Sequence, residues 1–269
     1  MSTAGYGSAV AAVEIGRWGV LWGLAASLVP VVLVAGISVA RRLGLERELL
    51  VATLRAIAQL VVAGWALTLL LGGDTSIWWA WAWVAGMVPV AADAARRRER
   101  RLPGLGWTTG LGVALGLSTS LAVVFGLGIL PLESRVLVPV AGMVVGNSLK
   151  VVVVSATCLV DGLRHRAGEV EAMLALGFGS VRAVRDVASD ALRLSLRPQL
   201  ETTRSVGMVF LPGALTGLIL AGVDPMEAVL IQAALLFLIL GTAAVTGLVV
   251  VAAGVRFFVA DGRFEPPGA

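Results

Sequence analysis

Long apolar runs, each of about 20 residues, recur along the sequence and restrict it to folds that a membrane can hold. About 20 apolar residues is the length that crosses the roughly 30 Å hydrocarbon core as a helix. Backbone groups in lipid need internal partners, and the period-two alternation typical of a β-barrel is missing from these runs. The sequence therefore predicts an all-α, polytopic membrane protein with about seven transmembrane helices, at residues 16–40, 49–71, 76–95, 106–129, 136–160, 203–222 and 226–255.

The composition supports this interpretation. Charged residues make up 14% of the 269 residues and hydrophobic ones 58%, against about 25% and about 45–50% in soluble domains. Most soluble enzymes are thereby excluded. We expect a single transmembrane domain over residues 1–269, with a short external segment at 1–15 and a tail at 257–269. The first residues lack a basic region before a short apolar core, so no cleaved signal peptide is expected.

The arginines predict the orientation of the chain in the cytoplasmic (plasma) membrane. They fall in alternate loops, which by the positive-inside rule are cytoplasmic. The N-terminus is then outside and the C-terminus, with its tail, is inside. No basic stripe lies beside aromatic residues, so lipid and not nucleic acid is the expected surroundings. The loop arginines are Arg41, Arg42, Arg47, Arg96, Arg97, Arg98, Arg100, Arg101, Arg164, Arg166, Arg182, Arg185, Arg193 and Arg197, with Arg256 and Arg263 in the tail.

The loop at 161–202 is too polar to span a membrane and too periodic to be a linker. Within 169–177, apolar residues follow helical spacing, acids occupy the first turn, and Gly177 is placed to end the helix. Ser180 precedes a second amphipathic run, whose apolar stripe extends from Val181 to Leu196. We predict a structured cytoplasmic helical hairpin. The alternative is a pair of helices that lie passively on the membrane surface.

Residues for catalysis or metal binding are scarce. The chain has one histidine, His165, and one cysteine, Cys158, so neither a zinc site nor a Ser-His pair within a span is formed by the sequence pattern. A P-loop needs a lysine after a glycine-rich turn, but the only lysine, Lys150, lies inside an apolar run. We expect a non-catalytic protein without a metal site or cofactor of its own. Any ATP-driven work requires a separate chain.

Polar residues inside the spans are candidates for a substrate path, because each ionisable one costs roughly 2.5–3.5 kcal/mol at a helix centre. Lys150 lies near the middle of the fifth span and shares a helix face with Gly142 and Gly146. The alternative is a snorkelling lysine or a structural pair with a carboxylate. In the sixth span Pro212, with Gly213 and Gly217, predicts a hinge or local break, although proline also occurs there for packing alone. The predicted path comprises Arg55, Gln59, Asn147, Ser148, Lys150, Met208, Pro212 and Thr216.

Four blocks of this sequence resemble the FetB-type ABC transporter permeases, a bacterial iron-export family that also includes plant membrane subunits linked to aluminium tolerance. The resemblance extends over most of residues 45–255, and its last block is long and compositionally unusual. The blocks are Leu54-Arg-Ala-Ile-Ala-Gln-Leu60, Val138-Pro-Val-Ala-Gly-Met-Val-Val-Gly-Asn-Ser148, Glu171-Ala-Met-Leu-Ala-Leu-Gly177 and the stretch from Thr203 to Pro225, which continues through Gln232.

The resemblance implies a permease that forms a homodimer and binds a separate P-loop ATP-binding subunit, which holds ATP and magnesium. The hairpin would then couple the spans to that subunit as a rigid body. The coupling residues implied are Glu171, Ala172, Leu174, Leu176 and Gly177. The second half of the general coupling-loop pattern is not matched in full.

The resemblance also implies export of iron, of another metal or of a metal chelate. A cation at Lys150 repels free metal ions, so an anionic organic substrate such as a nucleotide sugar is an alternative. An ATP-independent secondary transporter or channel is a further alternative, although such proteins ordinarily show paired broken helices or an internal repeat. A structural or assembly role in the membrane is the last.

Overall fold

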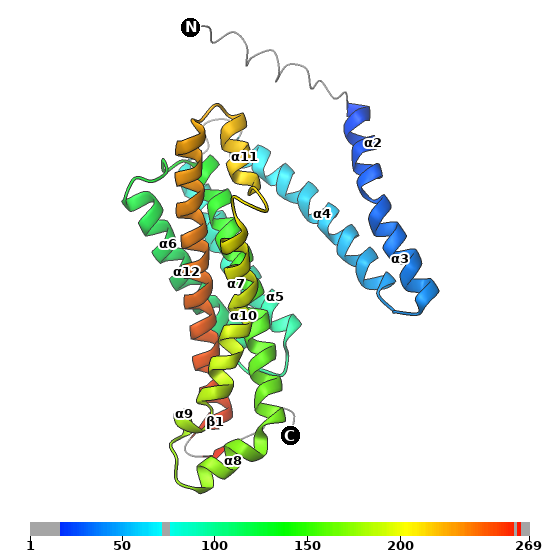
Figure 1. Ribbon diagram of the computed structural model, residues 1–269. Coiled ribbons are helices and arrows are strands. Elements are labelled where there is room, and N and C mark those ends of the chain that lie inside the picture. The colour runs from blue at the N-terminus through cyan, green and yellow to red at the C-terminus, as the bar shows by residue number, and fades with distance from the viewer. Residues whose placement is uncertain (1–16, 72–75, 261–262, 265–269) are drawn as a thin grey trace. The chain divides into compact units, whose positions relative to one another are not determined.

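The computed structural model describes residues 17–71, 76–260 and 263–264 (Figure 1). It divides the chain into two compact units, residues 1–72 and residues 73–269. The single domain expected from the sequence stays a prediction. Residues 1–15 and most of the predicted tail lie outside the described residues.

The N-terminal unit contains three helices, α2 (Arg17–Ser27), α3 (Val29–Arg41) and α4 (Glu46–Leu71). Ser38 closes the turn between α3 and α4: its Oγ donates to Glu46 Oε2 at 2.9 Å and accepts the Leu45 amide at 2.9 Å. Arg42 adopts a left-handed φ of 53° in this turn. Most large apolar side chains of α3 and α4 are exposed, as expected of helices that face lipid or other protein.

The C-terminal unit is built on five long helices, α5 (Ile77–Arg98), α6 (Leu105–Gly126), α7 (Ser134–His165), α10 (Arg185–Ser205) and α12 (Pro225–Phe258). Helix α12 contacts α6, α7 and α10, and α5 packs against α6 and α7. Figure 1 shows α7, α10 and α12 alongside one another, with short helices at one end. This arrangement confirms the all-α membrane fold.

Glycines allow α6 and α7 to approach α12 closely. A Cβ added at Gly116 would lie 2.5 Å from Thr242 Cγ2, and one at Gly112 would lie 3.1 Å from Thr246 Cγ2. At Gly254 the corresponding distance to Leu159 Cδ2 is 2.5 Å. Small residues at such contacts let membrane helices pack backbone to backbone.

Five described helical stretches are long and apolar enough to cross a membrane. They are Trp22–Arg41, Glu46–Thr68, Leu105–Gly126, Ser134–His165 and Pro225–Phe258. The third predicted span corresponds to α5, which ends in three arginines and is not among the five. The exact number of spans therefore stays a prediction.

The sixth predicted span is not the single helix 203–222 that the sequence suggested. Helix α10 runs through that boundary to Ser205, the chain is irregular from 206 to 212, and α11 (Gly213–Leu220) follows. Gly207 has a left-handed φ of 87°, and its amide donates to Phe210 O at 3.1 Å. The chain is interrupted just before Pro212, which is the N-cap of α11, and the hinge expected at Pro212 stays a prediction. The predicted start of the span is wrong because the buried face of α10, which begins with Val187 and Ala191, continues at helical spacing through the polar Ser195 and Gln199.

Candidate functional site

The hairpin predicted at 161–202 is present with shifted limits. Helix α7 continues to His165, beyond the predicted end of the fifth span at 160, and α8 (Ala167–Ala175) and the short α9 (Ser180–Ala183) follow. Gly177 ends α8 in the left-handed conformation, with a φ of 84°. The Phe178 amide donates to Met173 O and the Gly177 amide to Leu174 O, each at 3.0 Å. This pair of bonds is a Schellman motif, which confirms Gly177 as the stop.

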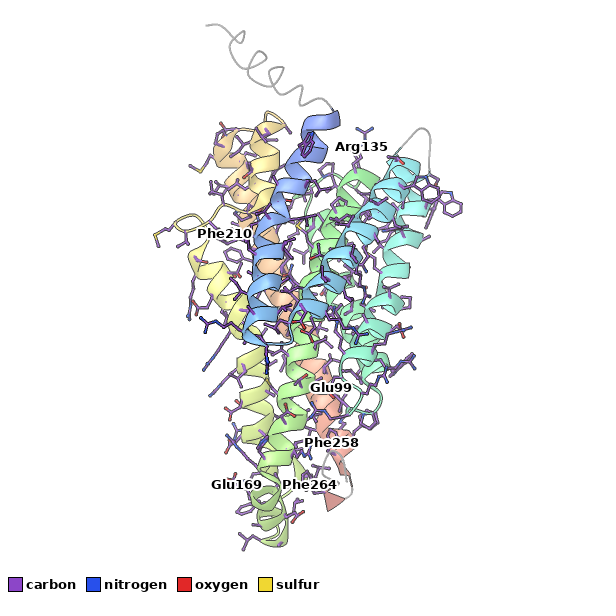
Figure 2. All side chains as sticks on the ribbon, turned by 90° about the vertical axis from the view of Figure 1, so that its right-hand side faces the viewer. Glu99, Arg135, Glu169, Phe210, Phe258 and Phe264 are labelled. Carbon is purple, nitrogen blue, oxygen red and sulfur yellow. The ribbon has the colours of Figure 1, made fainter. Side chains whose placement is uncertain are left out.

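One face of the hairpin belongs to the core of the C-terminal unit. Val170 and Val184 are each only 1% exposed, and Met173 and Leu174 pack against the same cluster. Two short strands after α12, β1 (Val259–Ala260) and β2 (Arg263–Phe264), pair antiparallel, and β2 contacts α8. Figure 2 shows Phe258, Phe264 and Glu169 together at this end of the unit. One face of the hairpin is therefore packed against the core, and the alternative of helices that lie passively on the membrane surface stays open.

The opposite face of the hairpin is exposed and partly apolar. Leu176 is 77% exposed and Val181 is 76% exposed, and Glu171 and Ala172 are exposed beside them. The Arg182 guanidinium lies 4.8 Å from the Phe178 ring centroid, a cation–π distance. We call Glu171, Ala172, Leu176, Gly177 and Val181 the hairpin tip. Two large exposed apolar side chains on a tip whose other face is packed are suited to contact with another protein.

An ion network ties the loop after α5 to α7 near the hairpin. Arg101 contacts Glu99 Oε2 through Nη2 at 2.8 Å and Asp161 Oδ1 through Nη1 at 2.7 Å. Thr157 Oγ1 donates to Glu99 Oε2 at 3.2 Å. Glu99 is 4% exposed. Burial of Glu99 acts to raise its pKa. The hydrogen bonds and the positive charge of Arg101, together with the hydrogen bond from Thr157, outweigh burial, so the Glu99 pKa lies below its ordinary value.

A second ion pair, Arg166 Nη2 to Asp190 Oδ2 at 3.3 Å, joins the end of α7 to α10. Beside it lies a cavity of about 530 Å³ whose lining includes Cys158, Asp161 and His165. His165 Nδ1 lies 2.7 Å from the backbone oxygen of Asp161. Within the described ranges, no three or more histidine, cysteine or carboxylate side chains are grouped closely enough to hold a metal ion.

The predicted path residues of the fifth span share the middle of α7. Asn147 donates through Nδ2 to Met143 O at 2.8 Å. Ser148 is fully buried, and its Oγ has no hydrogen-bond partner among the described residues. Lys150 is exposed on the surface of the C-terminal unit.

The remaining path residues belong to other elements. Met208 is 89% exposed in the break of the sixth span, Pro212 is buried at its end, and Thr216 is exposed on α11. Arg55 and Gln59 are exposed on α4, in the N-terminal unit. The use of these residues by a substrate stays a prediction.

The glycines predicted to pack closely do not do so within the described chain. A Cβ at Gly146, Gly213 or Gly217 would meet nothing within 4 Å, and one at Gly142 would meet only Met87 Cε, at 3.9 Å. Their packing role also stays a prediction. The close approaches occur instead at Gly112, Gly116, Gly247 and Gly254, which sequence reasoning missed because glycine is common throughout the spans.

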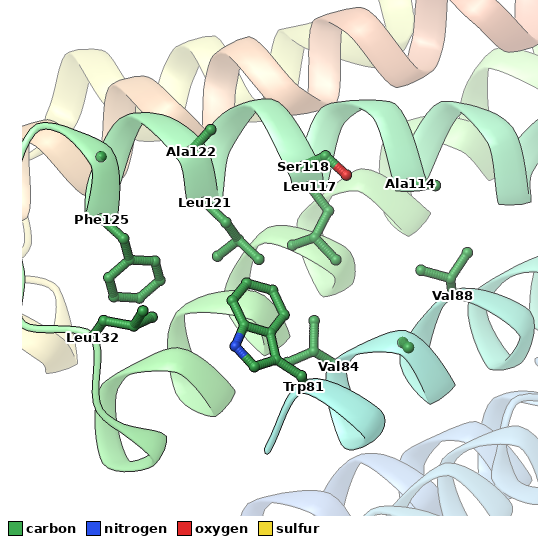
Figure 3. A pocket seen from close by; sticks show the side chains of 12 residues that line it. Trp81, Val84, Val88, Ala114, Leu117, Ser118, Leu121, Ala122, Phe125 and Leu132 are labelled. Carbon is green, nitrogen blue, oxygen red and sulfur yellow. The ribbon is translucent and has the colours of Figure 1, made fainter. Parts of the chain in front are cut away.

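An apolar groove of about 700 Å³ lies between α5 and α6 (Figure 3). Leu121 and Phe125 line the groove from α6, Trp81 lies opposite Leu121 on α5, and Ser118 supplies the only side-chain hydroxyl of the lining. Such a surface suits hydrocarbon and not a charged solute. In the sequence, only the tryptophan cluster at the start of α5, which includes Trp81, points to this apolar groove.

Comparisons with known proteins agree with this architecture. The model of the uncharacterised protein family UPF0014 matches residues 21–259. "Protein ALUMINUM SENSITIVE 3" of Arabidopsis thaliana is 34% identical over 83% of this chain and 82% of its own length. The "UPF0014 membrane protein YjkA" of Bacillus subtilis is 30% identical over 83% of this chain and 89% of its own.

A bacterial relative has a more specific name. The "Probable iron export permease protein FetB" of Escherichia coli is 28% identical over 84% of this chain and 87% of its own length. No solved structure matches the chain. The resemblance inferred from the four sequence blocks is thereby confirmed.

Proposed function

Because the chain belongs to the UPF0014 family of membrane proteins, we propose that it is the transmembrane permease subunit of an ABC transporter. ATP and magnesium are bound by a separate P-loop ATP-binding subunit, and this chain performs no catalysis. The observation that supports the proposal best is the hairpin tip. It presents Leu176 and Val181 to the surroundings while its other face is fixed in the core.

The tip residues Glu171, Ala172, Leu176 and Gly177 contact the ATP-binding subunit, and Leu174 braces the tip from the core side. Helices α8 and α9 of the hairpin connect α7 to α10, and both α7 and α10 pack against α12. Closure of the ATP-binding subunits therefore moves these three helices as one body, because packed interfaces shift between discrete arrangements and do not deform gradually.

A negative charge introduced at the hairpin tip tests whether the tip contacts the ATP-binding subunit. The chain is coexpressed with its ATP-binding subunit, and stimulated ATP hydrolysis is measured in Leu176→Asp. Burial of an unpaired carboxylate at the contact is expected to cost about 2 kcal/mol or more, which weakens docking roughly 30-fold. Leu127→Asp is the matched control, because Leu127 is 74% exposed at the opposite end of the unit, beyond α6. Equal stimulation in both variants would contradict the docking site.

The substrate proposed is iron or another metal, exported as a chelate. The support is that one relative is named as an iron export permease, while Lys150 presents a cation on the candidate path. Two like charges repel by about 4 kcal/mol at 4 Å near a protein surface, so a chelate with negative charge passes more easily than a bare ion. An anionic organic molecule such as a nucleotide sugar is the second candidate, favoured by the same lysine.

Lys150→Met tests the substrate class. Uptake of a ferric chelate, of Fe²⁺ and of a nucleotide sugar into inverted vesicles is compared with the wild type at fixed ATP. Weaker uptake of the anionic substrates and stronger uptake of Fe²⁺ are expected, because the repulsive cation is gone, and Lys150→Arg, which keeps the charge, should behave like the wild type. An unchanged preference in Lys150→Met would sink this assignment. Transport without any ATP-binding subunit would instead favour a secondary transporter or channel.

A further inference from the structure

Two adjoining cavities rich in arginine lie between the end of α7 and α10, which run alongside one another (Figure 1). The first is the cavity of about 530 Å³ beside His165, and the second has a volume of about 430 Å³. Arg166, Asp190 and Arg193 line both of them. We call the two together the basic pocket.

The carboxylates of the basic pocket are mostly neutralised already. Asp190 pairs with Arg166 at 3.3 Å, and Asp161 pairs with Arg101 at 2.7 Å. Asp186, which lines only the second cavity, forms no ion pair with another described residue. One acid is therefore left to offset the remaining arginines.

Three arginines of the basic pocket keep an uncompensated charge. Arg193 and Arg197 line the first cavity and Arg185 lines the second, and within the described ranges none of the three has an ion-pair partner. Three positive charges against the one of Asp186 leave a net charge of about +2. Such a cluster in a concave site attracts an anion.

The basic pocket lies at the level of the lipid headgroups. Helix α7 has 32 residues and is about 48 Å long, whereas the hydrocarbon core is about 30 Å thick and takes about 20 of them. Its start, with Glu133 and Arg135 exposed, suits the opposite membrane surface. Counted from there, Cys158 and Gly162 in the lining lie just beyond the core. A Cβ at Gly162 would lie 2.7 Å from Val187 Cγ1, so α10 passes this level too.

The floor of the first cavity is apolar. Val187, Ala191 and Leu194 line it from α10, beside Arg193 and Arg197. Leu194 is 42% exposed at the rim. A free anion gains nothing from apolar walls, whereas a phospholipid presents a phosphate directly beside its acyl chains. Arginine binds phosphate through two parallel hydrogen bonds, and basic pockets between membrane helices at this level recognise anionic headgroups.

We propose that the basic pocket binds the phosphate of an anionic phospholipid from the leaflet on the hairpin side. Arg193 and Arg197 hold the phosphate, and the acyl chains leave past Leu194 toward the core. Because Arg166 ends α7 and Arg193 belongs to α10, a headgroup held by both joins these two helices beside the hairpin. The site goes beyond the proposed permease function, since its ligand is a lipid of the membrane and not the transported solute.

Lipid binding to the full-length chain in detergent tests the inference. Native mass spectrometry measures the affinities for phosphatidylglycerol, which is anionic, for phosphatidylcholine, which has no net charge, and for inorganic phosphate. Phosphatidylglycerol should bind the wild type at least about tenfold more tightly than phosphatidylcholine. Replacing both arginines, Arg193→Gln with Arg197→Gln, should weaken phosphatidylglycerol binding about 30-fold, because each arginine near an anionic surface contributes about a fivefold change in affinity.

The matched control is Arg98→Gln with Arg100→Gln. These two arginines are exposed at the end of α5 and in the loop after it, and they line neither cavity. The control removes the same charge near the same membrane surface, so it should keep the affinity of the wild type.

A second pair of variants guards against misfolding of the double mutant. Leu194→Glu places a carboxylate one turn from Arg197, where it competes with the phosphate and should also weaken phosphatidylglycerol binding. Leu194→Gln has nearly the same size without the charge and should bind at least as well as phosphatidylcholine-free wild type. An unchanged melting temperature in each variant shows that the fold is kept.

Four results would overturn the lipid site. These are equal affinities of the wild type for the two lipids; equal weakening in the arginine control; no weakening in either pocket variant; and displacement of phosphatidylglycerol by inorganic phosphate at the same concentration, which assigns the pocket to free anions. All measurements use this chain alone. Stimulated ATP hydrolysis therefore stays a separate test, and failure of the lipid site leaves the proposed permease function untouched.

Discussion

Glu99 is buried as a charged group because Arg101 reaches it from the same loop and also reaches Asp161 on α7. In the sequence, Glu99 and Asp161 are two acidic residues and Arg101 is one of many loop arginines. No local pattern indicates that the three side chains contact one another. Asp161 is 60 residues from Arg101 along the chain. Its contact depends on how α5 packs on α7, and sequence periodicity does not report that.

The network at Glu99 makes stability depend on pH. Its pKa is lower in the folded protein than its ordinary value of 4.5, so its contribution is present above about pH 4.5 and is lost as the pH falls through the folded pKa. Between pH 6 and pH 3 the wild type should lose more thermal stability in detergent than Glu99→Gln. At pH 6 that variant should be less stable by about 1–3 kcal/mol, because Arg101 loses a buried partner.

Glu133→Gln is the control for this comparison, since Glu133 is exposed at the start of α7. Its melting temperature should follow that of the wild type across the same pH range. Parallel curves for all three proteins would show that Glu99 contributes nothing through its charge.

At the scale of elements, sequence signals within a few residues of a helix end predicted that end well. Helix limits that depend on packing against distant helices were not predicted. The acids, periodicity and terminal glycine of 169–177 predicted α8 and its end at Gly177. The proline predicted the break, but the same signal did not show that α10 would reach Ser205. Hydropathy changes at residue 203, where the span was predicted to begin, but the helical spacing of the packed face of α10 continues past it. The helix follows this spacing because both α7 and α12 pack on that face.

The packing of α6 on α12 gives a prediction for this scale. Gly116→Ala places a methyl group against Thr242 and its backbone oxygen, so the helices must separate. We expect a loss of about 1–3 kcal/mol, as for other overpacked cores, measured by thermal unfolding in detergent. Gly126→Ala, at the open end of the same helix, should be neutral or slightly stabilising. An equal loss in both variants would point to helix propensity and not to this contact.

At the scale of the whole molecule, the membrane class and the distribution of arginines determine the expected orientation. The N-terminus is predicted outside, and the hairpin and C-terminus inside. In the Cys158→Ser background, Glu133→Cys should react with a membrane-impermeant maleimide in intact cells. Leu176→Cys should react only after the membrane is opened. Reversed labelling would invert the orientation and remove the hairpin tip from the reach of a cytoplasmic ATP-binding subunit.

The sequence by itself determined the membrane class, the helical fold, the hairpin and its family. These follow from local periodicity, from the sign of loop charges and from contiguous motifs, which are all readable along the chain. Only the tertiary structure decided which glycines permit close packing, that Arg101 joins Glu99 to Asp161, and that the C-terminal strands brace α8. These depend on contacts between residues far apart in sequence, where many pairings have similar local chemistry and the packing of whole helices selects one.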